Sequence, residues 1–139
     1  MKITIYIDGG SRGNPGPAAF GVAFPSNEYA QFIGTATNNE AEYGGLIFAL
    51  KKVKSLYGKD KSKSMDIEIK SDSELLVKQM NGKYKIKNEN IQKLFLQAWN
   101  LTVEFKNLQI TYIPREENKK ADGLVNQALD SKRREQKLF

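Results

Sequence analysis

The sequence predicts an α/β fold in which a five-stranded mixed sheet, made of a three-stranded antiparallel meander and two parallel strands, carries helices on both faces. Two observations lead to this prediction. Apolar and polar residues first alternate through three short segments separated by turn-forming residues, and helical and strand periods then follow in alternation. The 139 residues, 40% apolar and 27% charged, match one globular domain, which we place at residues 1–130.

Three strands are expected at the start of the chain. Ile3, Ile5 and Ile7 alternate with polar residues, which predicts a strand over residues 3–8. Residues 9–17 contain four glycines and two prolines, so this strand is expected to end at Asp8. Residues 18–24 and 29–36 have the pattern of two further strands, joined by the turn sequence Pro-Ser-Asn-Glu. The three segments predict an antiparallel meander.

Helices and two more strands follow. Apolar residues at i, i+4, i+7 and i+11 predict a helix over residues 39–57 that ends at Gly58; they are Leu46, Leu50, Val53 and Tyr57. The polar residues 59–64 are expected to form a connector. The remaining pattern predicts strands over residues 65–70 and 108–113 and helices over residues 73–80, 88–105 and 117–130. Residues 131–139 form a basic tail without an apolar period, which is expected to fray.

The composition limits the chemistry. The chain has no Cys and no His, which excludes disulfide bonds, cysteine nucleophiles, Ser-His triads and imidazole-bound metals. Hydrolytic chemistry must therefore use carboxylates, lysines, hydroxyls or a hard metal ion bound through oxygen. The net charge of +6 favours a polyanionic partner, although a soluble basic protein has the same balance. Because no membrane span and no signal peptide is evident, we expect a cytoplasmic protein without a membrane partner.

Four carboxylates are expected at one edge of the predicted sheet. The topology places Asp8 and Asp72 at the carboxyl ends of parallel strands, and Glu42 and Asp122 in helices that begin at the same edge. Each acid alone has an ordinary explanation as a turn or helix-start residue. Four close carboxylates, however, would repel one another unless a divalent cation neutralised them. An all-oxygen ligand set suits Mg²⁺ or Mn²⁺.

The four acids lie in four sequence blocks: Asp8-Gly-Gly-x-x-x-Asn14-Pro-Gly, Thr37-Asn38-Asn39-x-x-Glu42, Ser71-Asp72-Ser73 and Asn118-x-x-Ala121-Asp122. Together these blocks resemble those of the type 1 ribonuclease H family, and the match runs from residue 2 to about residue 130. Any one block is a weak signal, but four in this order at compatible spacings are specific. The resemblance implies a ribonuclease H-like fold, which agrees with the element order derived above.

The resemblance also implies a function. It implies an endonuclease that cuts the RNA strand of RNA/DNA hybrids with two Mg²⁺ ions, for which Mn²⁺ can substitute, and leaves 5′-phosphate and 3′-hydroxyl ends. The metal-binding and catalytic residues it implies are Asp8, Glu42, Asp72 and Asp122. The substrate contacts it implies are Gly9, Asn14, Thr37, Asn38, Asn39 and Ser73. The alternative is a noncatalytic module of the same fold that binds hybrids or double-stranded RNA, against which the four intact acids argue.

The chain departs from the family pattern in two places. Many members carry a His in the loop before the last acid; this loop has none, and the candidates for its role are Arg115, Glu116 and Glu117. The loop resembles archaeal, plant and some bacterial members, which stay active without the His and some of which also cut double-stranded RNA. The basic helix that some bacterial relatives insert is also missing. The candidate phosphate contacts are Arg12, Lys83, Lys85 and Lys87, although a solvated surface explains the lysines nearly as well. We expect a monomer.

Overall fold

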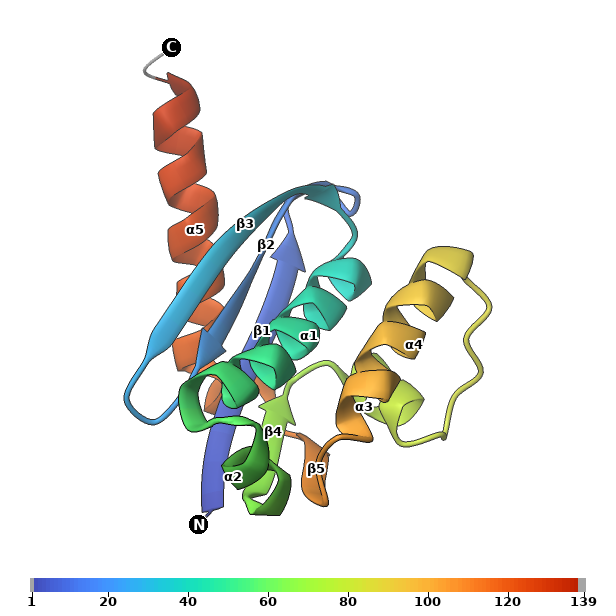
Figure 1. The fold of residues 1–139 in the computed structure, drawn as a ribbon. Coiled ribbons are helices and arrows are strands. Elements are labelled where there is room, and N and C mark those ends of the chain that lie inside the picture. The colour runs from blue at the N-terminus through green and yellow to red at the C-terminus, as the bar shows by residue number, and fades with distance from the viewer. Residues whose placement is uncertain (1, 138–139) are drawn as a thin grey trace.

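The computed structural model describes residues 2–137, and over this range the chain forms a five-stranded sheet with the strand order β3-β2-β1-β4-β5 (Figure 1). The strands are β1 (Lys2–Ser11), β2 (Gly16–Ala23), β3 (Glu28–Ala36), β4 (Asp66–Ser71) and β5 (Asn107–Tyr112). The first three pair antiparallel, whereas β4 runs parallel to both β1 and β5. The predicted mixed sheet is therefore confirmed.

Helices cover both faces of this sheet. They are α1 (Asn38–Tyr57), α2 (Lys59–Ser64), α3 (Glu74–Met80), α4 (Glu89–Thr102) and α5 (Lys119–Lys137), with a 3-10 turn at Arg115–Glu117. Helix α1 packs on β1 and β2 with α4 beside it, and α5 packs on the opposite face, across β1, β2 and β3. No helix in the described part of the chain is long and apolar enough to cross a membrane.

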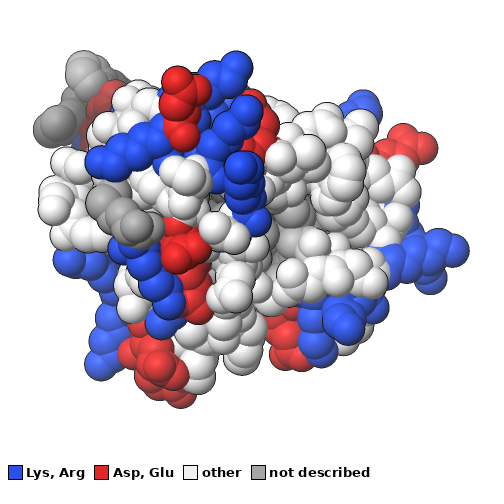
Figure 2. Space-filling model, turned by 60° about the horizontal axis from the view of Figure 1, so that its bottom comes forward, with Lys and Arg blue, Asp and Glu red and all other residues white. Residues whose placement is uncertain are grey.

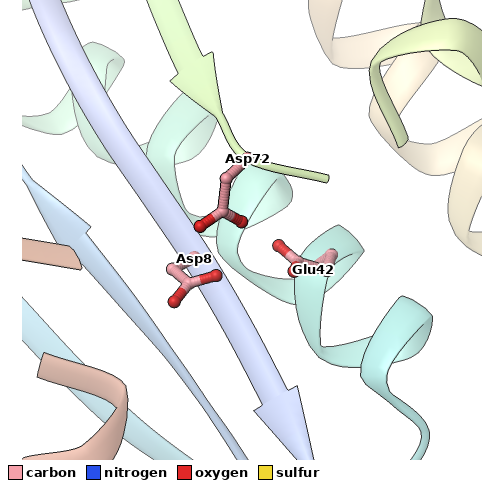
Figure 3. A group of neighbouring side chains, drawn as sticks. All are labelled: Asp8, Glu42 and Asp72. Carbon is pink, nitrogen blue, oxygen red and sulfur yellow. The ribbon is translucent and has the colours of Figure 1, made fainter. Parts of the chain in front are cut away.

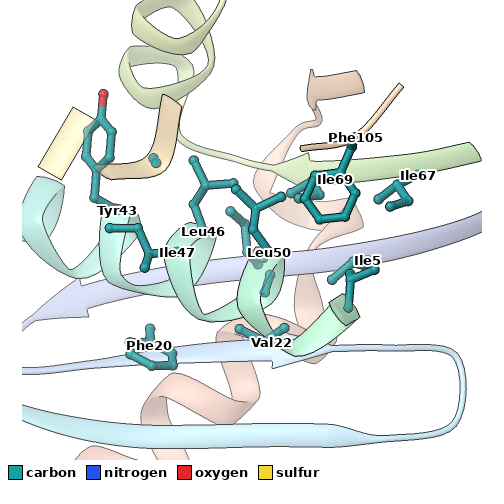
Figure 4. Packing of buried hydrophobic residues seen from close by; sticks show 14 of the residues in the cluster. Ile5, Phe20, Val22, Tyr43, Leu46, Ile47, Leu50, Ile67, Ile69 and Phe105 are labelled. Carbon is teal, nitrogen blue, oxygen red and sulfur yellow. The ribbon is translucent and has the colours of Figure 1, made fainter. Parts of the chain in front are cut away.

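The larger hydrophobic core lies between the sheet and α1. Ile5 of β1 is fully buried there in one cluster with Leu46 and Leu50 of α1 (Figure 4). Ile7 of β1 is fully buried in the same cluster. Burial of each such side chain stabilises the fold by about 1.5–3 kcal/mol. Because side chains alternate along a strand, the odd-numbered isoleucines of β1 face α1 and Asp8 belongs to the other face.

Strand β1 is longer than the sequence predicts. It continues through Gly9 and Gly10 to Ser11, and these residues pair with β2 at Phe20, Ala19 and Ala18. The expected end at Asp8 is wrong because the antiparallel ladder with β2 stabilises extended glycines that favour a turn in isolation. Asp8 therefore lies inside a strand, held by pairing on the side of β2.

The prediction of a connector over residues 59–64 is also wrong, because these residues form the short helix α2. Gly58, with a φ of 85°, separates α2 from α1. Ser62 is buried, and its hydroxyl donates to the carbonyl of Lys59 at 3.0 Å. The polar sequence gives no apolar period by which this helix could be recognised.

Residues 131–137 of the expected tail are helical, because α5 continues past Asp130 to Lys137. Residues 138–139 of the expected tail lie outside the described residues. The extension is rich in Lys, Arg, Glu and Gln, which have high helix propensity without forming an apolar face. In Figure 1 its end projects beyond the sheet.

Candidate active site

The ends of β1 and β4 place two acids beside each other. The last residue pair of these parallel strands joins Ile7 to Ser71. Asp8 and Asp72 follow directly, and β1 continues beyond that point without β4 beside it. Glu42, near the start of α1, reaches the same place (Figure 3). Ligand oxygens of the three acids all lie within 4.8 Å of one another.

Gly9 allows α1 to approach this point. A Cβ atom at Gly9 would lie 2.4 Å from both the carbonyl carbon of Ala41 and the backbone nitrogen of Glu42, closer than real Cβ contacts allow. The backbone of α1 therefore rests directly on the backbone of β1, one residue after Asp8. This close contact brings the Glu42 carboxylate to Asp8, which gives Gly9 a structural role besides the substrate contact implied by the resemblance.

Gly21 allows α5 to approach the sheet closely, as Gly9 does for α1. The sequence gives no signal that singles out Gly21. It pairs with Asp8 across the β1–β2 ladder and so lies on the same face of the sheet. A Cβ atom there would lie 2.5 Å from the carbonyl oxygen of Ala121 and 2.7 Å from the Cβ of Leu124. The first turns of α5, which carry Asp122, therefore approach Asp8 closely.

Gly21→Ala is expected to destabilise the fold by about 1–3 kcal/mol, because the added methyl group must displace α5. Gly123→Ala is a matched control in the same helix. A Cβ atom at Gly123 meets nothing within 4 Å among the described residues, so this change should stabilise α5 by about 0.5–1 kcal/mol. Urea unfolding of both variants measures the difference. Equal stabilities would contradict the close approach at Gly21.

The acids open into a hollow of about 390 Å³. The residues of the sequence prediction that line it are Asp8, Gly9, Arg12, Asn38, Asn39, Glu42, Asp72, Ser73, Arg115 and Asp122. Asp122 lines the hollow but lies outside the close group of three acids. The predicted residues that do not line it are Asn14, Thr37, Glu116, Glu117, Lys83, Lys85 and Lys87. The three lysines lie exposed between α3 and α4.

Burial and neighbouring charges raise the pKa of two of the acids, Asp8 and Glu42. Burial, followed by the charge of Asp72, raises the pKa of Asp8 to about 8. Burial also raises the pKa of Glu42 well above its usual value, with further contributions from Asp8 and Asp72, and the nearby charge of Arg115 opposes this shift. The Oε2 atom of Glu42 is buried and has no hydrogen-bond partner among the described residues. A buried, unpartnered carboxylate oxygen in an all-oxygen donor set fits a hard divalent cation.

Glu40 is not available to this group. Its Oε1 atom accepts from the backbone nitrogen of Thr37 at 2.8 Å, while the Thr37 hydroxyl accepts from the nitrogen of Glu40. This reciprocal pair is the capping box of α1. Ser73 likewise caps α3, because its hydroxyl accepts from the nitrogen of Leu76. Thr37 and Ser73 therefore have helix-capping roles, whatever contacts they make with a ligand.

Asparagine side chains join the β1–β2 turn to the start of α1. The Oδ1 atom of Asn38 accepts from the nitrogen of Ser11 at 2.8 Å. The Oδ1 atom of Asn14 accepts from the nitrogen of Asn38 at 2.9 Å. Asn39 lines the hollow, and its buried Oδ1 atom has no partner among the described residues. Asn14 and Asn38 thus fix the rim of the hollow.

Two buried polar contacts hold the helices that carry the acids. Asn118 is buried, and its Nδ2 atom donates to the carbonyl of Ile7 at 2.8 Å, which ties the start of α5 to β1 immediately before Asp8. The hydroxyl of Tyr43, the residue after Glu42, donates to Gln79 of α3 at 2.8 Å. These contacts position groups from distant parts of the sequence around one hollow.

The fold and the hollow thus define an α/β protein with a candidate divalent-metal site at the carboxyl ends of two parallel strands. A family model described as reverse transcriptase-like matches residues 7–128. Ribonuclease HI of Halobacterium salinarum is 40% identical over 135 residues, which cover 93% of this chain and 65% of the relative. The crystal structure of RNase H1 from that archaeon superposes with a TM-score of 0.84 at 39% identity and covers 94% of this chain and 99% of its own.

Two other matches are to proteins of similar sequence. LC11-RNase H1, solved in complex with an RNA/DNA hybrid, has a TM-score of 0.87 and 43% identity, and the match covers 93% of this chain and 97% of that one. A protein of Mycobacterium tuberculosis described as bifunctional is 40% identical over 138 residues, which are 94% of this chain but only 36% of the relative's length. The chain belongs to the type 1 ribonuclease H family, as its four sequence blocks predict.

Proposed function

We propose that this protein is an endoribonuclease that hydrolyses the RNA strand of RNA/DNA hybrids and leaves 5′-phosphate and 3′-hydroxyl ends. The observation that carries the proposal is the group of Asp8, Glu42 and Asp72 in an open hollow at the strand ends. Membership of the family supports it, as does the likeness to an RNase H1 solved with a hybrid.

The acids have the role of metal ligands in this proposal. Asp8, Glu42 and Asp72, joined by Asp122 from the wall of the hollow, would hold two Mg²⁺ ions, or Mn²⁺ in their place. A bound pair of ions supplies activation of a water molecule and stabilisation of the leaving oxygen, so no protein nucleophile is required. This agrees with a chain that has neither His nor Cys.

The rim of the hollow has the role of recognising the substrate. The amides of Asn38 and Asn39 lie beside the acids and have the donors and acceptors needed to contact sugars and base edges in a minor groove. Such contacts read shape and the 2′-hydroxyl, so we expect little sequence preference. Arg115 lines the hollow, whereas Glu116 and Glu117 do not, which makes Arg115 the best candidate for the position of the missing His.

The test is cleavage of matched, labelled RNA/DNA, RNA/RNA and DNA/DNA duplexes in Mg²⁺, with the ends mapped. Cleavage of only the RNA strand of the hybrid, with 5′-phosphate ends, is the expected result. Binding of the hybrid without cleavage would instead support the noncatalytic alternative. Cleavage of the RNA duplex would widen the substrate class. Size-exclusion chromatography of the active protein tests whether it acts as a monomer, as we propose.

Exchange of Lys83, Lys85 and Lys87 for alanine is expected to raise KM with little change in kcat, because these exposed lysines are proposed to contact phosphates outside the hollow. Loss of three phosphate contacts should lower the slope of log Kd against log salt by about 2.7. Initial rates and binding at several salt concentrations measure both effects. An unchanged salt slope would assign the three lysines to a solvated surface.

A further inference from the structure

A second, smaller hollow of about 110 Å³ adjoins the acidic one. We call it the side hollow; its walls are formed by Arg12, Pro17, Phe32, Leu129, Lys132, Arg133 and Gln136. Arg12 and Leu129 line both hollows. The two hollows are therefore neighbours that share these two side chains, and the side hollow lies beside the extension of α5, the part of the helix after Asp130.

The spacing along α5 explains why both hollows border the same helix. Asp122, Asn126 and Asp130 lie at i, i+4 and i+8, and Arg133 lies at i+11, so all four residues share one face of the helix. At 1.5 Å per residue, Arg133 lies about 16 Å along the helix from Asp122. One rigid helix thus carries a candidate metal ligand at one end and basic residues at the other.

The region around the side hollow is basic, and contacts hold some of its basic side chains in place. Residues 131–137 contain four basic residues and one acidic residue, a net +3 out of +6 for the chain. Arg12 is held by Asp130 at 2.8 Å and by Asn126 at 3.2 Å, and the Lys132 ammonium lies 5.4 Å from the centre of the Phe32 ring. Among the described residues, Arg133 makes no ion pair. On the face seen in Figure 2, acidic and basic side chains are interspersed.

We propose that the side hollow and the extension of α5 bind backbone phosphates of the hybrid beyond the cleavage site, through Lys132 and Arg133. This inference rests on the proposed function, because it names where the same substrate continues. A distance of about 16 Å corresponds to about five base-pair steps of a duplex. Contact with these residues therefore requires a hybrid that extends about five base pairs from the cut.

The test compares the double variant K132Q/R133Q with the control K59Q/K63Q, which removes the same charge from α2. Figure 1 places α2 at the end of the molecule opposite the extension of α5. Binding is measured by fluorescence anisotropy in the Asp8→Asn background, so that the hybrid stays intact, with duplexes of about eight and about eighteen base pairs. Circular dichroism melts check that the variants are folded.

For the long hybrid, K132Q/R133Q is expected to lower the slope of log Kd against log salt by about two and to weaken binding about tenfold at low salt. The short hybrid reaches about four base pairs on either side of a central cut. It should therefore bind equally to Asp8→Asn with and without K132Q/R133Q. In the protein with Asp8 restored, kcat on the long hybrid should be unchanged. K59Q/K63Q in the Asp8→Asn background should bind both hybrids as Asp8→Asn alone does.

An unchanged slope with the long hybrid would overturn the inference, and so would equal losses on both hybrids or an equal loss in the control. These outcomes differ from failure of the proposed function itself, in which the unmodified chain neither binds nor cuts the hybrid. A chain that cuts the hybrid while K132Q/R133Q binds as tightly as the parent refutes only the role of the extension.

Discussion

Replacing Asp8 with asparagine is expected to abolish cleavage of RNA/DNA hybrids, with kcat reduced by at least about a thousandfold. The change keeps the volume of the side chain but removes the charge at the centre of the acidic group, where Glu42 and Asp72 lie within 4.8 Å. A bound metal supplies several kcal/mol of stabilisation to a phosphoryl transition state, and about 4 kcal/mol corresponds to a thousandfold in rate. Single-turnover cleavage of a labelled hybrid measures the loss.

Glu40→Gln is the matched control for this change. Glu40 lies two residues from Glu42, but its carboxylate caps α1, and glutamine can fill the same capping position. This variant should retain activity, whereas Asp72→Asn should behave as Asp8→Asn does. Turnover by purified Asp8→Asn at a rate near that of the unmodified protein would refute the assignment of Asp8 as a metal ligand.

In the absence of divalent cations, the stability of the folded protein is expected to fall as the pH rises from about 4 to about 8. The pKa of Asp8 is raised from 3.8 to about 8, so the folded state keeps a proton that the unfolded state releases. Stability therefore declines with pH throughout this interval, and Glu42, whose pKa is also raised, acts in the same direction. Asp8→Asn removes this penalty and should raise Tm at pH 8 by about 5 °C.

Mg²⁺ should reverse this loss at pH 8. At a concentration a hundredfold above its dissociation constant, a ligand that binds only the folded state stabilises it by about 2.7 kcal/mol, or about 10 °C in Tm for a chain of this size. The effect should shrink at pH 5, where Asp8 keeps its proton because its pKa is raised to about 8, and in Asp8→Asn. Thermal melts at both pH values, with EDTA or Mg²⁺, measure it. Melts that superimpose at pH 8 would contradict metal binding by these acids.

The sequence predicts an antiparallel meander joined by two parallel strands, with four acids at one edge of the sheet, because apolar periods and topology rules are sufficient for both. These rules place Asp8 and Asp72 at the carboxyl ends of parallel strands, and in the structure β1 and β4 run parallel as neighbours. Local signals failed where pairing or propensity outweighed them. The glycines after Asp8 extend β1 because β2 pairs with them, and α2 and the end of α5 form helices without any apolar period.

The contacts that complete the hollow could not be predicted from the sequence. Capping-box spacing fits Thr37 with Glu40 as well as Asn39 with Glu42, and only the structure shows that Thr37 and Glu40 form the box. The sequence predicts an acid at the start of α5 but not how far Asp122 lies from the other three. Such distances depend on how closely helices approach the sheet, which is determined by side-chain volume at the contacts.

The close approach of helices at Gly9 and Gly21 has a consequence for mutational scans. Neither residue has a side chain that could bind a metal or a nucleic acid, yet each lets a helix with an acid approach Asp8. A saturation scan should therefore find two intolerant positions that a search for reactive groups would pass over, while Gly123 in the same helix tolerates alanine. Transplanting the acids into another sheet would fail to reproduce the site unless these two bare backbone positions were transplanted with them.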